Sequence, residues 1–115
     1  MITTAKHPEE EPNGALSRGG VWVRLPAERW QHIATEHPEL AGLRNAVLET
    51  IANADHVLEG NAGELLAVSM LDSSKALVVA YREVESRDGF VITAFVTSRV
   101  ATVFKRRRQL WPSSN

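Results

Sequence analysis

Residues 76–97 read ALVVAYREVESRDGFVITAFVT, and this stretch decides the fold. Two runs rich in β-forming residues, 76–84 and 90–97, flank the polar segment 85–89. That segment ends in Asp88-Gly89, and an Asp-Gly pair supplies the positive φ that a hairpin loop usually needs. The stretch therefore predicts a long antiparallel β-hairpin.

Shorter strands are predicted on the N-terminal side of this hairpin. Residues 64–70 are apolar and precede a turn at residues 72–74, and residues 55–59 form another short run. Residues 21–25 alternate apolar and polar side chains, which is typical of a strand with one buried face. Together with the hairpin, these runs predict one strand near the N-terminus and a later meander of three or four strands.

Helices are predicted between and after the strands. Residues 27–37 have an apolar helical face that includes His37. Pro38 ends this helix and begins a second one, which runs to about residue 54 with apolar residues at helical spacing. Thr97 or Ser98 is placed to cap a last helix that runs to about residue 110.

The chain is therefore expected to form one α+β domain. Its 115 residues are close to the usual size of a single domain. We expect an N-terminal strand and two helices packed on a four-stranded antiparallel sheet, with the helices on one side, and a C-terminal helix. Residues 1–19 are expected to be a flexible lead-in, 20–111 the domain and 112–115 a tail.

The composition excludes several classes of protein. The chain has no cysteine, which excludes disulfide frameworks, zinc fingers, iron–sulfur clusters and thiol catalysis. No apolar run approaches the roughly 20 residues that span a bilayer. The opening residues also lack the apolar stretch of a secretory signal. We therefore expect a cytoplasmic protein without a membrane segment.

Charge is distributed unevenly along the chain. From Arg99 onward there are five basic residues and no acidic ones, which leaves eight basic against fourteen acidic residues elsewhere. Such a segment can attract an anion, and a solvated helix face is the alternative interpretation. On the expected last helix, Lys105, Arg106 and Arg108 are exposed, whereas Arg107 lies on the apolar stripe with a packed stem and a free tip.

His37 is the first candidate for acid–base chemistry. It lies on the last turn of its helix, where the helix dipole favours the protonated imidazole. The alternative is a histidine that only hydrogen-bonds the free carbonyls of the helix end. His32 is expected at the surface beside Glu28 or Glu36. Because His32 and His37 are about 140° apart around a helix, they do not converge, and we predict no metal or cofactor.

The hairpin carries the other polar candidates. Tyr81 and Arg82 lie on opposite faces of one strand, and Thr93 and Thr97 share a face of the next. Folding about Arg87 places Tyr81 opposite Thr93, and a one-residue bulge places Arg82 there instead. Plain β-propensity also explains both threonines.

These residues resemble a known group of nucleases. The runs Val21–Leu25, Trp30-x-His32-Ile33 and His37–Leu40 look like the opening of small bacterial and phage proteins in the barnase/EndoU/colicin/RelE-like nuclease superfamily. The later runs Lys75–Arg82, Gly89–Phe95 and Leu110-Trp111 are similar to that family's strand signatures. The resemblance covers about residues 20–111.

The resemblance implies a two-helix unit packed on a four-stranded antiparallel sheet that cuts RNA without a metal. By position, the family's histidine falls on His37 and its strand hydroxyl on Thr93. Cationic help would come from Lys75, Arg82 or Arg99, and we place Arg82 in the catalytic set. The remaining expected substrate-binding residues are Lys75, Tyr81, Thr97, Arg99, Lys105, Arg106 and Arg108.

The predicted function is therefore a metal-independent, toxin-like endoribonuclease, with RNA as substrate and a neutralising antitoxin or immunity-type protein as partner. Metal-free cleavage through the ribose hydroxyl needs proton transfer and cations, which histidine and arginine supply. The alternative is a non-catalytic nuclease-like module that acts through a protein partner. Ala76 favours that alternative, because the family often has an aromatic residue there.

Overall fold

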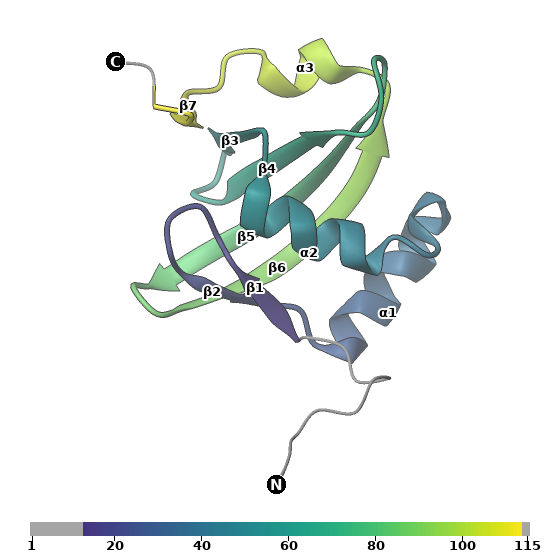
Figure 1. The fold of residues 1–115 in the computed structure, drawn as a ribbon, viewed down its shortest axis with the longest axis vertical. Helices are drawn as coiled ribbons and strands as arrows, with labels where there is room; N and C mark the ends of the chain where they lie inside the picture. Colours follow the sequence, from purple (N-terminus) through teal and green to yellow (C-terminus); the bar gives the residue numbers. More distant parts are fainter. Residues whose placement is uncertain (1–12, 114–115) are drawn as a thin grey trace, which may run out of the picture.

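The long hairpin predicted over residues 76–97 forms the centre of the sheet (Figure 1). The computed structural model describes residues 13–113, in which β5 (Ala76–Glu85) pairs antiparallel with β6 (Asp88–Thr97). The turn itself is Ser86-Arg87, and Gly89 already lies in the strand. Gly89 is needed for close approach rather than for a positive φ, because a Cβ there would collide with the Arg82 carbonyl oxygen.

The sheet extends on both sides of this hairpin. On one side follow β4 (Leu65–Met70), β3 (His56–Glu59) and β7 (Gln109–Trp111), all antiparallel. On the other side, β2 (Trp22–Arg24) pairs parallel with β6, and β1 (Gly14–Leu16) pairs antiparallel with β2. The predicted strands are confirmed, but the four-stranded antiparallel sheet is wrong. The sheet is mixed and has seven strands among the described residues.

Two of the additional strands, β1 and β7, lie where the sequence predicts other structure, which is a flexible lead-in for β1 and the end of the last helix for β7. Residues 14–16 form β1, so the expected flexible lead-in is wrong for its second part, and residues 1–12 lie outside the described range. Ser17 is buried and donates a hydrogen bond to Glu83 at 2.6 Å. Residues 14–16 lack the longer alternation of apolar and polar side chains by which residues 21–25 indicate β2, so the sequence does not identify β1.

The helical predictions are correct in kind but wrong in extent. Helix α1 (Ala27–Glu36) is followed by a single 3-10 turn, Pro38–Leu40, and helix α2 (Arg44–Asn53) begins six residues after Pro38. Gly42 has a φ of 78°, which no α-helix accommodates, so one continuous helix from Pro38 is wrong.

The last helix is also shorter than predicted. Helix α3 (Val100–Phe104) ends because Lys105 is extended and Arg106 has a φ of 61°. The chain then forms β7 beside β3, with the Gln109 Oε1 atom 2.8 Å from His56 Nδ1. Val103 is buried on α3, and Val100 and Phe104 are partly buried.

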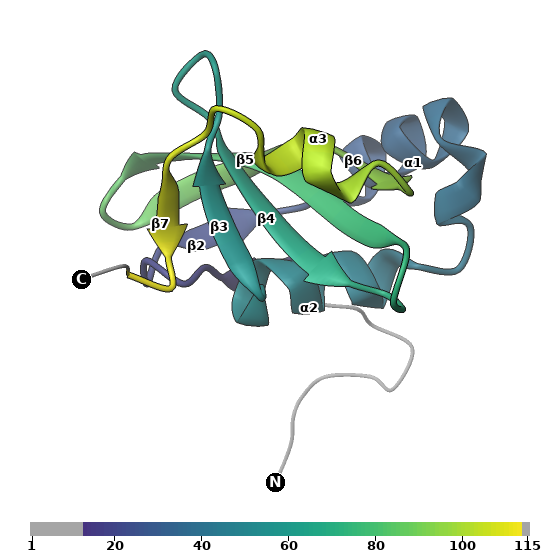
Figure 2. The same ribbon diagram turned by 90° about the horizontal axis from the view of Figure 1, so that it is seen from above.

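The sheet separates two apolar cores. We call the side covered by α2 the helix face and the opposite side the outer face. The helix face carries the larger core, in which α2 packs on β4 and β5 and alternate residues of β5 are buried, and Ile33 of α1 belongs to the same core. The outer face carries a smaller core beneath α3. Figure 2 shows α2 and α3 on opposite sides of the sheet, so the prediction that all helices share one side is wrong.

Candidate active site

His37 lies at the junction between α1 and the following turn. Its backbone N–H donates to the Ile33 carbonyl at 2.8 Å and closes the helix, and its carbonyl accepts the Leu40 N–H at 2.9 Å. The imidazole is half-buried, and its Nδ1 atom lies 3.4 Å from Glu39 Oε2. The ring centroid is 6.4 Å from that of Phe95 on β6. His37 therefore faces the central hairpin and is not directed only at its own helix end.

Glu39 ties this histidine to the edge of β6. Among the described residues, β2 pairs with β6 only at Gly89 and Phe90, so the later part of this edge has no strand neighbour. The Glu39 carboxylate accepts hydrogen bonds from its own backbone N–H and from that of Val96. These bonds hold the pKa of Glu39 below its ordinary value against the opposing effect of desolvation, and the positive charge of His37 contributes further. The carboxylate thus bridges the imidazole and the strand.

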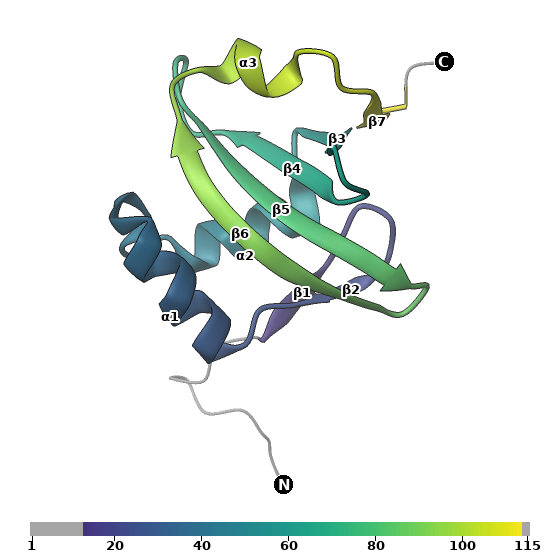
Figure 3. The ribbon, with the colours of Figure 1, turned by 180° about the vertical axis from the view of Figure 1, so that it is seen from behind.

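The predicted threonines lie on the outer face. Thr93 is opposite Ala80, which belongs to the outer core, and Thr97 is opposite Ala76. Thr93, Phe95 and Thr97 are alternate residues of β6 and therefore share this face. Figure 3 looks onto it, with β5 and β6 in front of α2, α1 beside β6, and α3 across one end.

Both predicted cross-strand partners of Thr93 are wrong. The register shifts between Ala80 and Tyr81, and Ile92 is the extra residue of a β-bulge, so Thr93 is opposite Ala80. Arg82 is opposite Phe90 and lies on the outer face, two residues along β5 from the position opposite Thr93. Its Nη2 atom donates to the Ala62 carbonyl at 2.7 Å. Arg82 and Thr93 thus share a face without being direct neighbours.

A pocket at the end of the outer face brings further candidates together. We call it the α3 pocket; its volume is about 260 Å³. Its lining residues are Leu66, Phe95, Thr97, Arg99, Thr102, Val103 and Arg107. Thr97 Oγ1 accepts the backbone N–H of Arg99 at 3.0 Å, which fixes the start of α3. Phe95 connects the pocket to His37, because the same ring contacts both.

The other predicted basic residues do not line this pocket. Lys105, Arg106 and Arg108 are exposed in the segment between α3 and β7, so their predicted helical arrangement is wrong. Arg108 lies 4.0 Å from Glu59. Lys75 is exposed in the turn before β5, where its backbone N–H donates to Asp72 at 2.8 Å.

Tyr81 lies on the helix face, away from Thr93 and Arg82. It is 1% exposed, and burial, together with the charge of Glu83, raises the pKa of its hydroxyl. It lines a small pocket of about 150 Å³ beneath Arg18, whose guanidinium is 4.6 Å from the Trp111 ring centroid. The arrangement separates Tyr81 from the other candidates.

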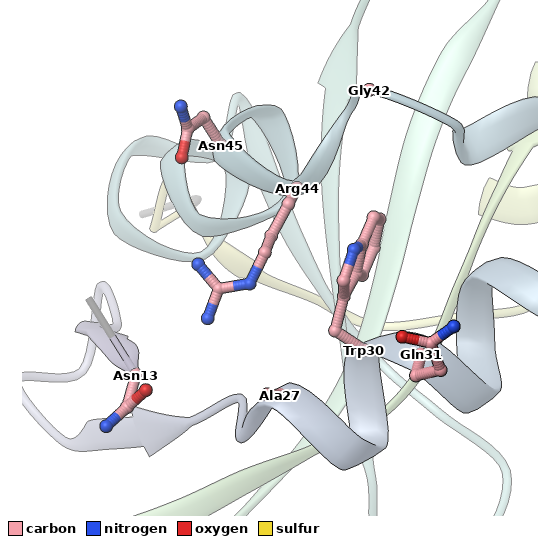
Figure 4. A pocket seen from close by; sticks show the side chains of 7 residues that line it. All are labelled: Asn13, Ala27, Trp30, Gln31, Gly42, Arg44 and Asn45. Carbon is pink, nitrogen blue, oxygen red and sulfur yellow. The ribbon is translucent and has the colours of Figure 1, made fainter. Parts of the chain in front are cut away.

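A larger hollow, of about 550 Å³, lies among α1, the start of α2 and the residue before β1. Figure 4 shows the Trp30 indole between Arg44 and Gln31, with Asn45 and Asn13 further around the rim. These groups can stack and hydrogen-bond, yet none of the predicted site residues lines the hollow. Size alone therefore does not identify the site, and we favour the outer face because the acid–base and cationic candidates lie there.

Sequence reasoning missed two contributors to the outer face. Glu39 is not among the predicted site residues, although its spacing of two residues from His37 could have indicated a pair. Thr102 was not singled out at all. His32 was predicted correctly, because its Nε2 atom lies 3.5 Å from Glu36 at the surface.

Three further observations bear on function. No cluster of three or more His, Asp or Glu residues in residues 13–113 is arranged to hold a metal ion. No helix in the same range is long and apolar enough to cross a membrane. Comparisons with protein-family models, curated proteins and solved structures found no match. The nuclease resemblance therefore stands on the sequence motifs.

Proposed function

We propose that the protein is an endoribonuclease that cuts RNA at the outer face through the ribose 2′-hydroxyl, in the cytoplasm. The observation that carries the proposal is the position of His37, paired with Glu39 and set against Phe95 beside a face that bears Thr93, Thr97 and Arg82. A proton donor, hydroxyls and cations are the groups that this reaction requires. Side chains supply each of these groups, so the proposed reaction is metal-independent.

In the proposed reaction, the 2′-oxygen attacks the neighbouring phosphorus and the bond from phosphorus to the 5′-oxygen breaks. His37 donates the proton that the departing 5′-oxygen takes up, and the 2′-hydroxyl releases its proton to solvent. Glu39, at 3.4 Å, orients the imidazole. Arg82 balances the charge that gathers on the phosphate oxygens, and the Thr93 hydroxyl donates a hydrogen bond to one of them. Arg99, beyond the other end of β6, binds an adjoining part of the RNA.

The test compares two histidines of the same helical region. His37→Ala should lower cleavage of a labelled RNA by about 10²–10⁴-fold, as for loss of a general acid. His32→Ala is the matched control, because His32 also pairs with a glutamate, at 3.5 Å, but is exposed. The assay contains a chelator and an RNA in which deoxyribose replaces ribose at the cleaved position. Equal cutting by wild type and His37→Ala, or cutting of the deoxyribose substrate, would contradict the proposal.

A second candidate function is binding to a protein partner without catalysis. Leu16 and Trp22 are directly paired across β1 and β2, and they are 56% and 41% exposed. Large exposed apolar side chains that lie together are typical of a protein-binding surface. An antitoxin-like or immunity-type protein is compatible with either function. An inactive wild-type protein that still binds such a partner through Trp22 would favour this second candidate.

A further inference from the structure

The α3 pocket combines an apolar wall with two arginines. Leu66, Phe95 and Val103 form the wall, and Arg99 and Arg107 contribute the cations. No acidic residue lines the pocket. A free phosphate ion would use the cations and leave the wall without a partner. A flat, partly apolar group that carries a phosphate would use both, and a nucleotide has this composition.

Arg107 is held in place by the chain but is not fully satisfied by it. Its Nη1 atom donates to the Val103 carbonyl oxygen at 3.0 Å, which fixes the plane of the guanidinium. Its Nε atom is buried, and no described residue accepts a hydrogen bond from it. Buried donors normally have an acceptor, so the described chain leaves one donor of Arg107 unsatisfied.

The acid whose charge acts on Arg107 does not neutralise it. Glu64 contributes to the local electrostatics, but its carboxylate accepts the Ala62 backbone N–H at 2.8 Å. Within residues 13–113, no carboxylate lies within ion-pair distance of Arg107. The guanidinium therefore has no carboxylate partner among the described residues.

Arg99 and Thr97 provide a second set of donors at the rim. The Arg99 side chain makes no hydrogen bond or ion pair with another described residue. Thr97 Oγ1 accepts the Arg99 backbone N–H, so the hydroxyl still has its own proton to donate. Two guanidinium groups and a hydroxyl match the oxygens of a phosphate ester.

We propose that the α3 pocket is a nucleotide subsite, with a base or ribose against Phe95 and Val103 and a phosphate between Arg99 and Arg107. The inference rests on the proposed function for its substrate, RNA. Because Phe95 also contacts His37, the bound nucleotide is next to the phosphate that is cut. Arg107 is then the main anchor of the basic segment, and Lys105, Arg106 and Arg108 are not.

The experiment measures binding of the four ribonucleoside 3′-monophosphates by calorimetry and by amide chemical shifts at low salt. The four parent nucleosides and inorganic phosphate are the comparison probes. At least one nucleotide should bind saturably, and it should bind at least tenfold more tightly than its nucleoside or inorganic phosphate. Arg107→Met keeps the packed stem and removes the charge, so it should weaken this binding at least tenfold, as should Arg99→Met. Arg87→Met is the matched control and should bind as the wild type does, because Arg87 is exposed in the turn between β5 and β6.

Several outcomes would overturn the inference. They are the absence of saturable binding, equal affinity in Arg107→Met and wild type, and inorganic phosphate binding as tightly as any nucleotide. If Arg107→Met does not fold, Arg107→Lys and Arg99→Met answer the same question, because both should weaken binding. Two variants distinguish a failure of this inference from a failure of the proposed function. His37→Ala should lose RNA cleavage but still bind the nucleotide. If the wild type cleaves RNA and Arg107→Met binds the nucleotide with unchanged affinity, only the subsite is refuted.

Discussion

The helix face and the outer face are built from alternate residues of the same strands, yet they are covered very differently. On β5, Leu77, Val79 and Tyr81 are buried in the core beneath α2. On the outer face, α3, which has five residues, covers one end of the sheet, and α1 lies beside the edge formed by β6. Polar residues therefore remain accessible on the outer face. The helix face, which is covered, stabilises the fold, whereas the outer face, which is less covered, is available for chemistry.

The largest expected effect comes from a truncation on the helix face. Leu77 is fully buried, and Leu77→Ala should lower the free energy of unfolding by about 2–5 kcal/mol because it leaves a cavity. Urea denaturation measures the change. Thr93→Val on the outer face is the contrasting variant and should reduce RNA cleavage with little effect on stability. The reverse pattern, a stable Leu77→Ala and an unfolded Thr93→Val, would break the comparison.

A smaller loss of stability is expected where the hairpin strands approach most closely. Gly89→Ala places a Cβ against the Arg82 carbonyl oxygen, which is backbone and cannot move aside easily. Overpacking of this kind should cost about 1–3 kcal/mol. Thermal unfolding followed by circular dichroism provides the measurement. An unchanged midpoint would show that the strands separate without cost at Gly89.

Glu39 gives a pH-dependent prediction for the junction between the two faces. Its pKa lies below the ordinary value in the folded protein, so its stabilising contribution is present above the unfolded pKa. It is lost as the pH falls through the folded pKa. The stability difference between wild type and Glu39→Gln should therefore be largest near neutral pH and shrink in acid. A difference that grows on acidification would contradict the contacts with Val96 and His37.

The smallest effect is expected from the exposed part of the basic segment. Changing Lys105, Arg106 and Arg108 together to Ala should alter stability by only about 0.5 kcal/mol, because these are surface positions. RNA binding should become weaker and less salt-dependent, since fewer counterions are released. Filter binding across a salt series checks this. An unchanged affinity and salt slope would reduce the three residues to a solvated surface.

The sequence predicts the central hairpin well, because each strand is long and rich in β-forming residues. It does not predict the register, because the bulge at Ile92 depends on packing across the sheet and no turn residue specifies it. The same limit explains the end of α3, where Arg106 adopts a positive φ and the chain turns to pair with β3. Strand pairing over such a distance in sequence overrides a helical pattern.

The candidate site shows the same division between local and long-range information. His37 can be singled out from the sequence because Pro38 fixes its place at a helix end. Its proximity to Phe95 depends on how α1 lies beside β6, which no local pattern specifies. Arg107 was predicted to have a free tip, whereas the structure fixes its guanidinium against Val103. That contact follows from the early end of α3.

The most direct test of the account is to map where single-stranded RNA binds. An oligonucleotide with 2′-deoxy sugars is not cut by the proposed mechanism, so it can be titrated into isotope-labelled protein and followed by amide chemical shifts. The account predicts the largest shifts on the outer face, at Thr93, Phe95, Thr97 and Arg99. Shifts concentrated instead around Trp30 in the hollow of the opposite side, with the outer face unchanged, would contradict it.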